Sequence, residues 1–186
     1  MTILKNEEIQ VENGTDMILA LLYAGGSRNA QNEEIVGNTR LVKLLFMLAH
    51  ETSLKKYMTD FRYDAYNFGP FSSELFDALQ ALINAGLVKS ERSGSEGYLD
   101  EADRFNAERE ADETDSTKNT HIYRLTAEGK VVGSALFNSL SNSEKNELTM
   151  IKQVFNSIPL RKLLQYVYRK YPKYTTASII RDQYTR

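Results

Sequence analysis

The sequence contains no cysteine and no tryptophan, only three prolines, and no apolar run of the roughly 18 residues that a membrane-spanning helix requires. The absence of cysteine excludes disulfide bonds, thiolate metal ligands and cysteine nucleophiles, and it is typical of a reducing cytoplasm. The first residues carry acids where a signal peptide would be apolar. We therefore expect a cytoplasmic protein without export or membrane attachment.

Sequence patterns that would indicate an enzyme are also missing. The two histidines, His50 and His121, have no cysteine or carboxylate at ligand spacing, so we predict structural roles for both and no bound metal. The pair Gly25-Gly26 lacks the Lys-Ser/Thr that follows the glycines of a phosphate-binding loop. No serine lies in a nucleophile-elbow pattern. We predict a non-enzymatic protein that needs no cofactor and acts by binding.

What the chain does contain is charge divided by segment. The 186 residues carry a net charge of only −2, with 41% hydrophobic and 26% charged residues. Segment 91–115, however, holds ten acids against three arginines, a net −7, whereas segment 155–186 holds seven cations against one acid, a net +6. Such separation indicates charged partners more directly than the total charge does.

Apolar spacing predicts the elements of the first half of the chain. We expect a buried helix at 17–24, a helix at 40–56 with leucines at three- and four-residue spacing, and a third helix from Ser72 to a left-handed cap at Gly86. Alternation over 61–66 predicts a short strand before that third helix. The Gly69-Pro70 pair then predicts a sharp turn.

The second half predicts a wing and further helices. Strands are expected at 87–92 and 120–125, joined by an acidic insert, 93–119, with too few apolar residues to order itself. Helices follow at 126–140, 142–157, 160–171 and 178–186. The fold class predicted is mainly α with a small antiparallel β wing, a winged helix-turn-helix plus C-terminal helices. We divide the chain into a lead-in (1–14), a winged-helix domain (15–140) and a C-terminal helical extension (141–186).

Several phrases resemble known families. LINAGLVKSE and YRLTAEGK resemble the wing entry and exit of winged-helix regulators. TRLVKLLFMLAH, the turn from Tyr66 to Leu75, and YVYRKYPKYTTAS resemble the YwgA-like family of small prokaryotic proteins, over roughly residues 39–180; a more distant similarity is to the Panacea antitoxin domain. The resemblance implies a regulatory role in toxin–antitoxin or antiviral defence systems and brings no catalytic residues.

The third helix is unsuited to reading DNA, although its place in the predicted fold is that of a recognition helix. It contains no lysine or arginine, and it carries Glu74 and Asp77, with Gln80 and Asn84 as its only amide side chains. Carboxylates here and in the wing would repel phosphates. We predict contact with a protein partner, such as a basic toxin or defence protein, with the acidic wing imitating nucleic acid. The predicted partner-binding residues are Glu74, Asp77, Asp100, Glu101, Asp103, Glu108, Glu110 and Asp112.

The C-terminal segment supports two alternatives. Its cations alternate with tyrosines, a pattern that suits single-stranded nucleic acid, and a nucleic-acid-binding transcriptional regulator is the first alternative. The tyrosines could instead pack on the core or form a dimer interface, and a homodimeric scaffold is the second alternative. The residues predicted for nucleic-acid binding are Arg161, Lys162, Arg169, Lys170, Lys173 and Tyr168.

Overall fold

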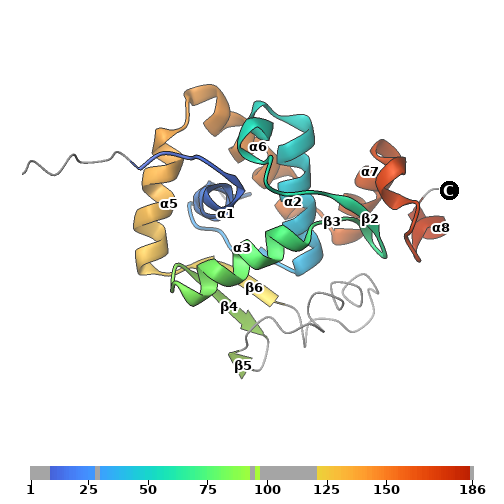
Figure 1. Cartoon of the computed structure of the whole chain (residues 1–186), viewed down its shortest axis with the longest axis horizontal. Helices are drawn as coiled ribbons and strands as arrows, with labels where there is room; N and C mark the ends of the chain where they lie inside the picture. Colours follow the sequence, from blue (N-terminus) through green and yellow to red (C-terminus); the bar gives the residue numbers. More distant parts are fainter. Residues whose placement is uncertain (1–8, 28–29, 93–94, 97–120, 185–186) are drawn as a thin grey trace, which may run out of the picture.

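The computed structural model describes residues 9–27, 30–92, 95–96 and 121–184 (Figure 1). It is mainly helical with a small antiparallel sheet, which confirms the predicted class of a winged helix with C-terminal helices. One hydrophobic core includes buried residues from Val11 to Tyr184.

Helix α1 (Gly14–Tyr23) lies at the centre of the molecule (Figure 1). Its residues from Met17 to Leu22 are all buried, as the nearly continuous apolar sequence predicts. The helix packs against α5 (Ala127–Ser139), α3 (Ser73–Asn84) and the sheet.

Helix α2 (Asn38–Glu51) is shorter than the predicted 40–56. Thr52 breaks it, with φ −128° and ψ 166°, and a 3₁₀ turn, η1 (Ser53–Tyr57), follows. The Thr52 hydroxyl donates to the carbonyl oxygen of Leu48 at 2.7 Å and accepts from the Leu54 amide at 3.2 Å. A threonine side chain that bonds to the backbone competes with the helix in this way, and periodicity alone does not reveal it.

A hairpin replaces the single strand expected at 61–66. Strand β2 (Asp64–Tyr66) pairs with β3 (Gly69–Phe71), so that Tyr66 lies opposite Gly69. Gly69 adopts φ +86°, a conformation that glycine reaches without a side-chain penalty. The turn itself is formed by Asn67 and Phe68, so the predicted Gly69-Pro70 turn is wrong by two residues: Gly69 and Pro70 begin β3, which leads directly into α3.

Ser72 caps α3 as predicted, because its hydroxyl accepts from the Leu75 amide at 3.3 Å. Leu75, Phe76, Leu79 and Leu82 form the buried face of the helix. Gly86, at φ +71°, ends it in the predicted left-handed conformation.

The sheet has the strand order β1-β6-β4-β5 and is antiparallel throughout. Strands β4 (Val88–Arg92) and β6 (His121–Leu125) form the predicted pair, with Val88 opposite Leu125. Strand β1 (Ile35–Val36) was not predicted, because two residues are too few to show alternation. Strand β5 (Ser95–Glu96) pairs with β4, so these two residues of the predicted insert belong to the sheet.

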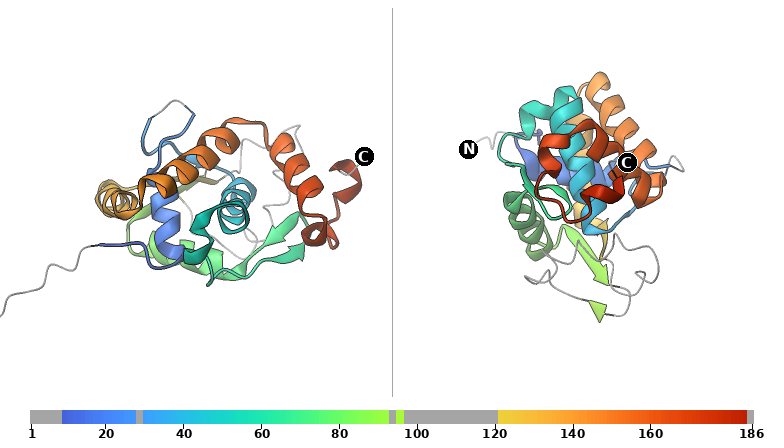
Figure 2. Two further views of the ribbon diagram at one scale, coloured as in Figure 1. Left: turned by 90° about the horizontal axis from the view of Figure 1, so that it is seen from above. Right: turned by 90° about the vertical axis from the view of Figure 1, so that its right-hand side faces the viewer.

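The C-terminal elements cover α1 and α2. Helix α6 (Asn142–Ser157) begins with a capping box between Ser141 and Glu144, and α7 (Leu160–Lys170) follows Pro159. A 3₁₀ turn, η4 (Pro172–Thr175), and the short α8 (Arg181–Tyr184) complete the chain. Helices α7 and α8 lie at the opposite end of the molecule from α5 (Figures 1 and 2).

Candidate partner-binding surfaces

The outer face of α3 is acidic and has no cation of its own. Asp77 is exposed and Glu74 is half-buried, one turn closer to the N-terminus of the helix. The Glu74 carboxylate accepts from the Ser72 hydroxyl at 3.0 Å. The backbone N–H of Glu74 and this serine lower the pKa of Glu74, so the carboxylate is held ionised at the start of the helix.

The two amide side chains of α3 bond to each other. Gln80 Nε2 donates to Asn84 Oδ1 at 2.9 Å. An amide that recognises adenine must present its donor and acceptor together to the base. The Gln80–Asn84 bond would have to break before either side chain could do so, and α3 therefore has no pre-arranged base-reading group.

The predicted wing residues, Asp100, Glu101, Asp103, Glu108, Glu110 and Asp112, lie outside the described residues. Three charged side chains of the sheet, Lys89, Glu91 and Arg124, form ion pairs with one another. Glu91 accepts from Lys89 Nζ at 2.8 Å and from Arg124 Nη2 at 2.8 Å, and Arg124 also lies 3.4 Å from Glu34.

All five predicted C-terminal cations, Arg161, Lys162, Arg169, Lys170 and Lys173, are exposed. One of them, Lys170, also donates to Glu51 Oε2 at 2.7 Å.

Glu51 also accepts hydrogen bonds from Tyr166 and Tyr171, each at 2.8 Å. Burial raises the pKa of Glu51, but the hydrogen bonds from Lys170, Tyr166 and Tyr171 outweigh it and leave the pKa below its ordinary value. These side chains fasten α7 to α2.

The structure corrects the prediction for Tyr168. Its side chain is fully buried, and its hydroxyl lies 2.6 Å from the Ser178 hydroxyl. Tyr184 is buried beside it, with the ring centroids 5.4 Å apart. Tyr168 therefore has no exposed ring face on which a base could stack; helical spacing on the core side of α7 explains its position.

Both histidines are hydrogen-bonded within the fold. His50 Nδ1 lies 2.9 Å from the Phe46 carbonyl oxygen, and its Nε2 lies 3.1 Å from the Tyr174 hydroxyl. His121 is buried, 2.7 Å from the Ser90 hydroxyl. Across the described residues, no group of three or more His, Cys, Asp or Glu side chains could hold a metal ion.

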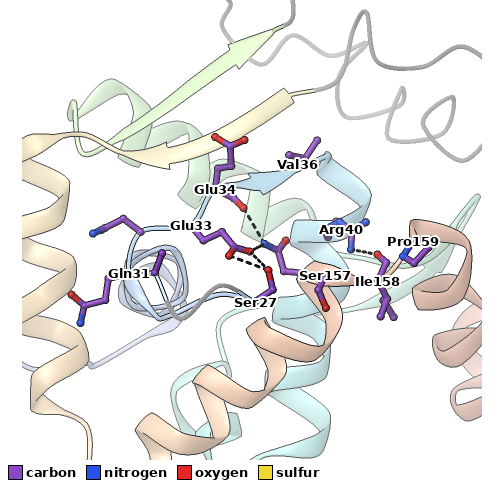
Figure 3. A pocket seen from close by; sticks show the side chains of 12 residues that line it. Ser27, Gln31, Glu33, Glu34, Val36, Arg40, Ser157, Ile158 and Pro159 are labelled. Carbon is purple, nitrogen blue, oxygen red and sulfur yellow. Dashed lines mark hydrogen bonds between the residues drawn. The ribbon is translucent and has the colours of Figure 1, made fainter.

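A hollow of about 790 Å³ opens between the loop after α1, strand β1 and the α6–α7 junction (Figure 3). Arg40 Nη1 donates across it to the carbonyl oxygens of Phe155 at 2.6 Å and Ile158 at 2.9 Å. Asn156 Nδ2 donates to Glu33 Oε1 at 2.8 Å. These hydrogen bonds connect the two walls of the hollow, so we assign Arg40 and Asn156 a structural role.

Sequence reasoning missed two buried lysines. Lys43 is buried, and its Nζ donates to the Pro70 carbonyl oxygen at 2.9 Å. Lys152 Nζ donates to the carbonyl oxygens of Leu22 and Ala24, both at 2.8 Å, at the C-terminal end of α1. The available signal for Lys43 was its position as the single polar residue in the apolar run 41–49.

Comparisons with known proteins found no relative of this chain. The chain matches no protein-family model, no curated protein and no solved structure. The resemblance to the YwgA-like family therefore stays a prediction. Within the described ranges, none of the helices has both the length and the apolar character needed to cross a membrane.

Proposed function

We propose that this chain is a non-enzymatic binding protein that acts in the cytoplasm by protein–protein contact, with the outer face of α3 as its docking surface. The observation that carries the proposal is the charge of that face. A helix in the recognition position presents Glu74 and Asp77, has no lysine or arginine, and ties its two amides together.

Such a face disfavours DNA and favours a basic protein. Phosphates spaced along a duplex would meet carboxylates, and like charges in close contact cost binding energy. A lysine- or arginine-rich surface would be attracted by the same carboxylates, which also steer its approach. The predicted acidic wing would extend this attraction beyond α3, in imitation of a nucleic acid.

The resemblance to the YwgA-like family and to the Panacea domain supports a regulatory or antitoxin-like setting for this contact. In that setting the partner is a toxin or defence protein with a basic, nucleic-acid-binding surface. The dimeric scaffold finds less support, because Tyr168 and Tyr184, which would supply its aromatic interface, are buried within the chain.

The test is co-expression of the tagged chain with the product of each neighbouring gene, followed by calorimetric titration of any complex. We expect a basic protein to co-purify with the natural chain and its affinity to fall at least tenfold for Asp77→Lys. Glu128→Lys is the matched control, since Glu128 is an exposed acid on α5. Equal affinity of Asp77→Lys and Glu128→Lys would show that α3 is not the docking surface.

A further inference from the structure

A basic strip, defined here as Arg161, Lys162, Arg169 and Lys173, lies along α7 and η4. Lys162 and Arg169 are seven residues apart, nearly two helical turns, which puts them on the same side of α7 and about 10 Å apart along its axis. All four side chains are exposed, and α7 contains no acidic residue.

Fold stability does not explain Arg161 and Lys162, although Arg169, in the last turn of α7, is favoured by the helix dipole. Arg161 and Lys162 occupy the first turn of α7, where the helix dipole favours acids and disfavours lysine and arginine. Lys170, by contrast, has a structural partner in Glu51. Cations placed against the local preference of the helix indicate a surface kept for a ligand of negative charge.

We propose that the basic strip binds the phosphate backbone of nucleic acid. Phosphate contact requires exposed cations at intervals along a surface, and the strip supplies them. Tyr168 is buried, so its ring cannot stack on a base of the bound nucleic acid. Phosphate contacts carry no sequence information, so this recognition is independent of base sequence. The inference concerns the end of the molecule remote from α5, and it stands whether or not α3 docks a protein (Figure 2).

An anionic membrane is a poorer fit to this surface. Helices that lie on membranes insert a broad apolar face beneath their cations. The apolar face of α7, with Leu163, Leu164 and Val167, is buried in the core. Ile179 is the one strongly exposed large apolar side chain among the described residues 160–184.

The test measures fluorescence anisotropy of a labelled 20-nucleotide single strand and a 20-base-pair duplex of arbitrary sequence, at 50 and 200 mM salt. With four phosphates neutralised, we expect affinity to fall on the order of 50- to 150-fold between the two salts. Arg161→Glu with Lys162→Glu should abolish binding. The matched control, Lys55→Glu with Lys130→Glu, reverses two exposed cations on η1 and α5 and should bind as the natural chain does.

Thermal unfolding distinguishes loss of the surface from loss of the fold. Glutamate suits the first turn of α7, so Arg161→Glu with Lys162→Glu should melt at or above the temperature of the natural chain. Equal weakening by the control pair would overturn the proposal, as would undiminished binding by the strip variant. Tighter binding to vesicles containing anionic lipid than to either oligonucleotide would also overturn it.

Discussion

Lys43 of α2 donates its ammonium proton to the carbonyl oxygen of Pro70, 2.9 Å away, inside the hydrophobic core. The bond fastens the β2–β3 hairpin to α2 at the second residue of β3, directly after Gly69. The position that a Cβ atom would occupy on Gly69 lies only 3.1 Å from the Tyr168 ring and 3.7 Å from Lys43. Three segments distant in sequence therefore meet at the start of β3, the strand that leads into α3.

Stability should rise with pH because of Lys43. Burial lowers the pKa of Lys43 to about 7 in the folded protein, from an ordinary value of 10.5. Between these values the unfolded chain binds a proton that the folded chain releases, so the free energy of unfolding increases with pH, by up to about 1.4 kcal/mol per pH unit. Urea unfolding at pH 7.0, 8.0 and 9.0 should show the increase.

The Lys43→Met variant isolates this effect. Methionine keeps the apolar stem without an ionisable group, so the dependence on pH should become weaker, with the remainder due to Lys152, whose pKa burial also lowers to about 7. Measurements stay below pH 9.5, because the raised pKa of Tyr168, about 12, reverses the trend at higher pH. If the free energy of unfolding rises equally with pH in Lys43→Met and in the natural chain, Lys43 is not the origin of the pH dependence.

Replacement of Gly129 by alanine should destabilise the fold severely. The added Cβ would lie 1.9 Å from the Leu87 carbonyl oxygen, where α5 begins beside the end of α3. Backbone must shift to relieve that overlap, at a cost of about 3 kcal/mol or more. Gly25→Ala is the control, because its Cβ would meet nothing closer than 4.0 Å. Chemical denaturation measures the free energy of unfolding of both variants. Equal losses for Gly129→Ala and Gly25→Ala would contradict the close contact between Gly129 and the Leu87 carbonyl oxygen.

Removal of the Glu51 charge should loosen α7 from α2. Glu51→Gln leaves at least one of the donors Tyr166, Tyr171 and Lys170 without its acceptor, which costs about 1–3 kcal/mol. Lys170→Met should cost less than about 1 kcal/mol, since the Lys170 side chain is 46% exposed. The free energies of unfolding of both variants, measured at pH 7, check this order. A larger loss for Lys170→Met than for Glu51→Gln would show that the ion pair, and not the tyrosine hydrogen bonds, holds α7 against α2.

Tyr168→Phe separates packing from binding. Loss of the hydroxyl removes the bond to Ser178 and should cost about 1 kcal/mol of stability. Nucleic-acid affinity should stay unchanged, because the ring is buried. If Tyr168→Phe melts like the natural chain but binds the oligonucleotide more weakly, Tyr168 belongs to the binding surface.

Local signals in the sequence predicted most of the scaffold. Ser72, Gly86 and the apolar spacing of α3 placed that helix within a residue or two, since a cap, a left-handed stop and a buried stripe are all encoded locally. The antiparallel pairing of β4 with β6 was predicted from order alone, across an insert that carries no pairing signal.

Long-range contacts account for what the sequence did not reveal. The partners of Lys43 and Lys152 are backbone carbonyls on other elements, which no side-chain pattern identifies. Tyr168 was assigned to a binding surface because alternation of tyrosine with cations has two meanings, and only burial distinguishes them. The charge of α3 and the exposure of Arg161, Lys162 and Arg169 were readable in advance.

The central claim is that α3 meets protein and not DNA. It is tested most directly by duplex binding of Gln80→Ala with Asn84→Ala, measured beside partner binding of Asp77→Lys. We expect unchanged duplex affinity for the first variant and at least tenfold weaker partner affinity for the second. Weaker duplex binding by Gln80→Ala with Asn84→Ala, together with unchanged partner affinity of Asp77→Lys, would contradict the claim.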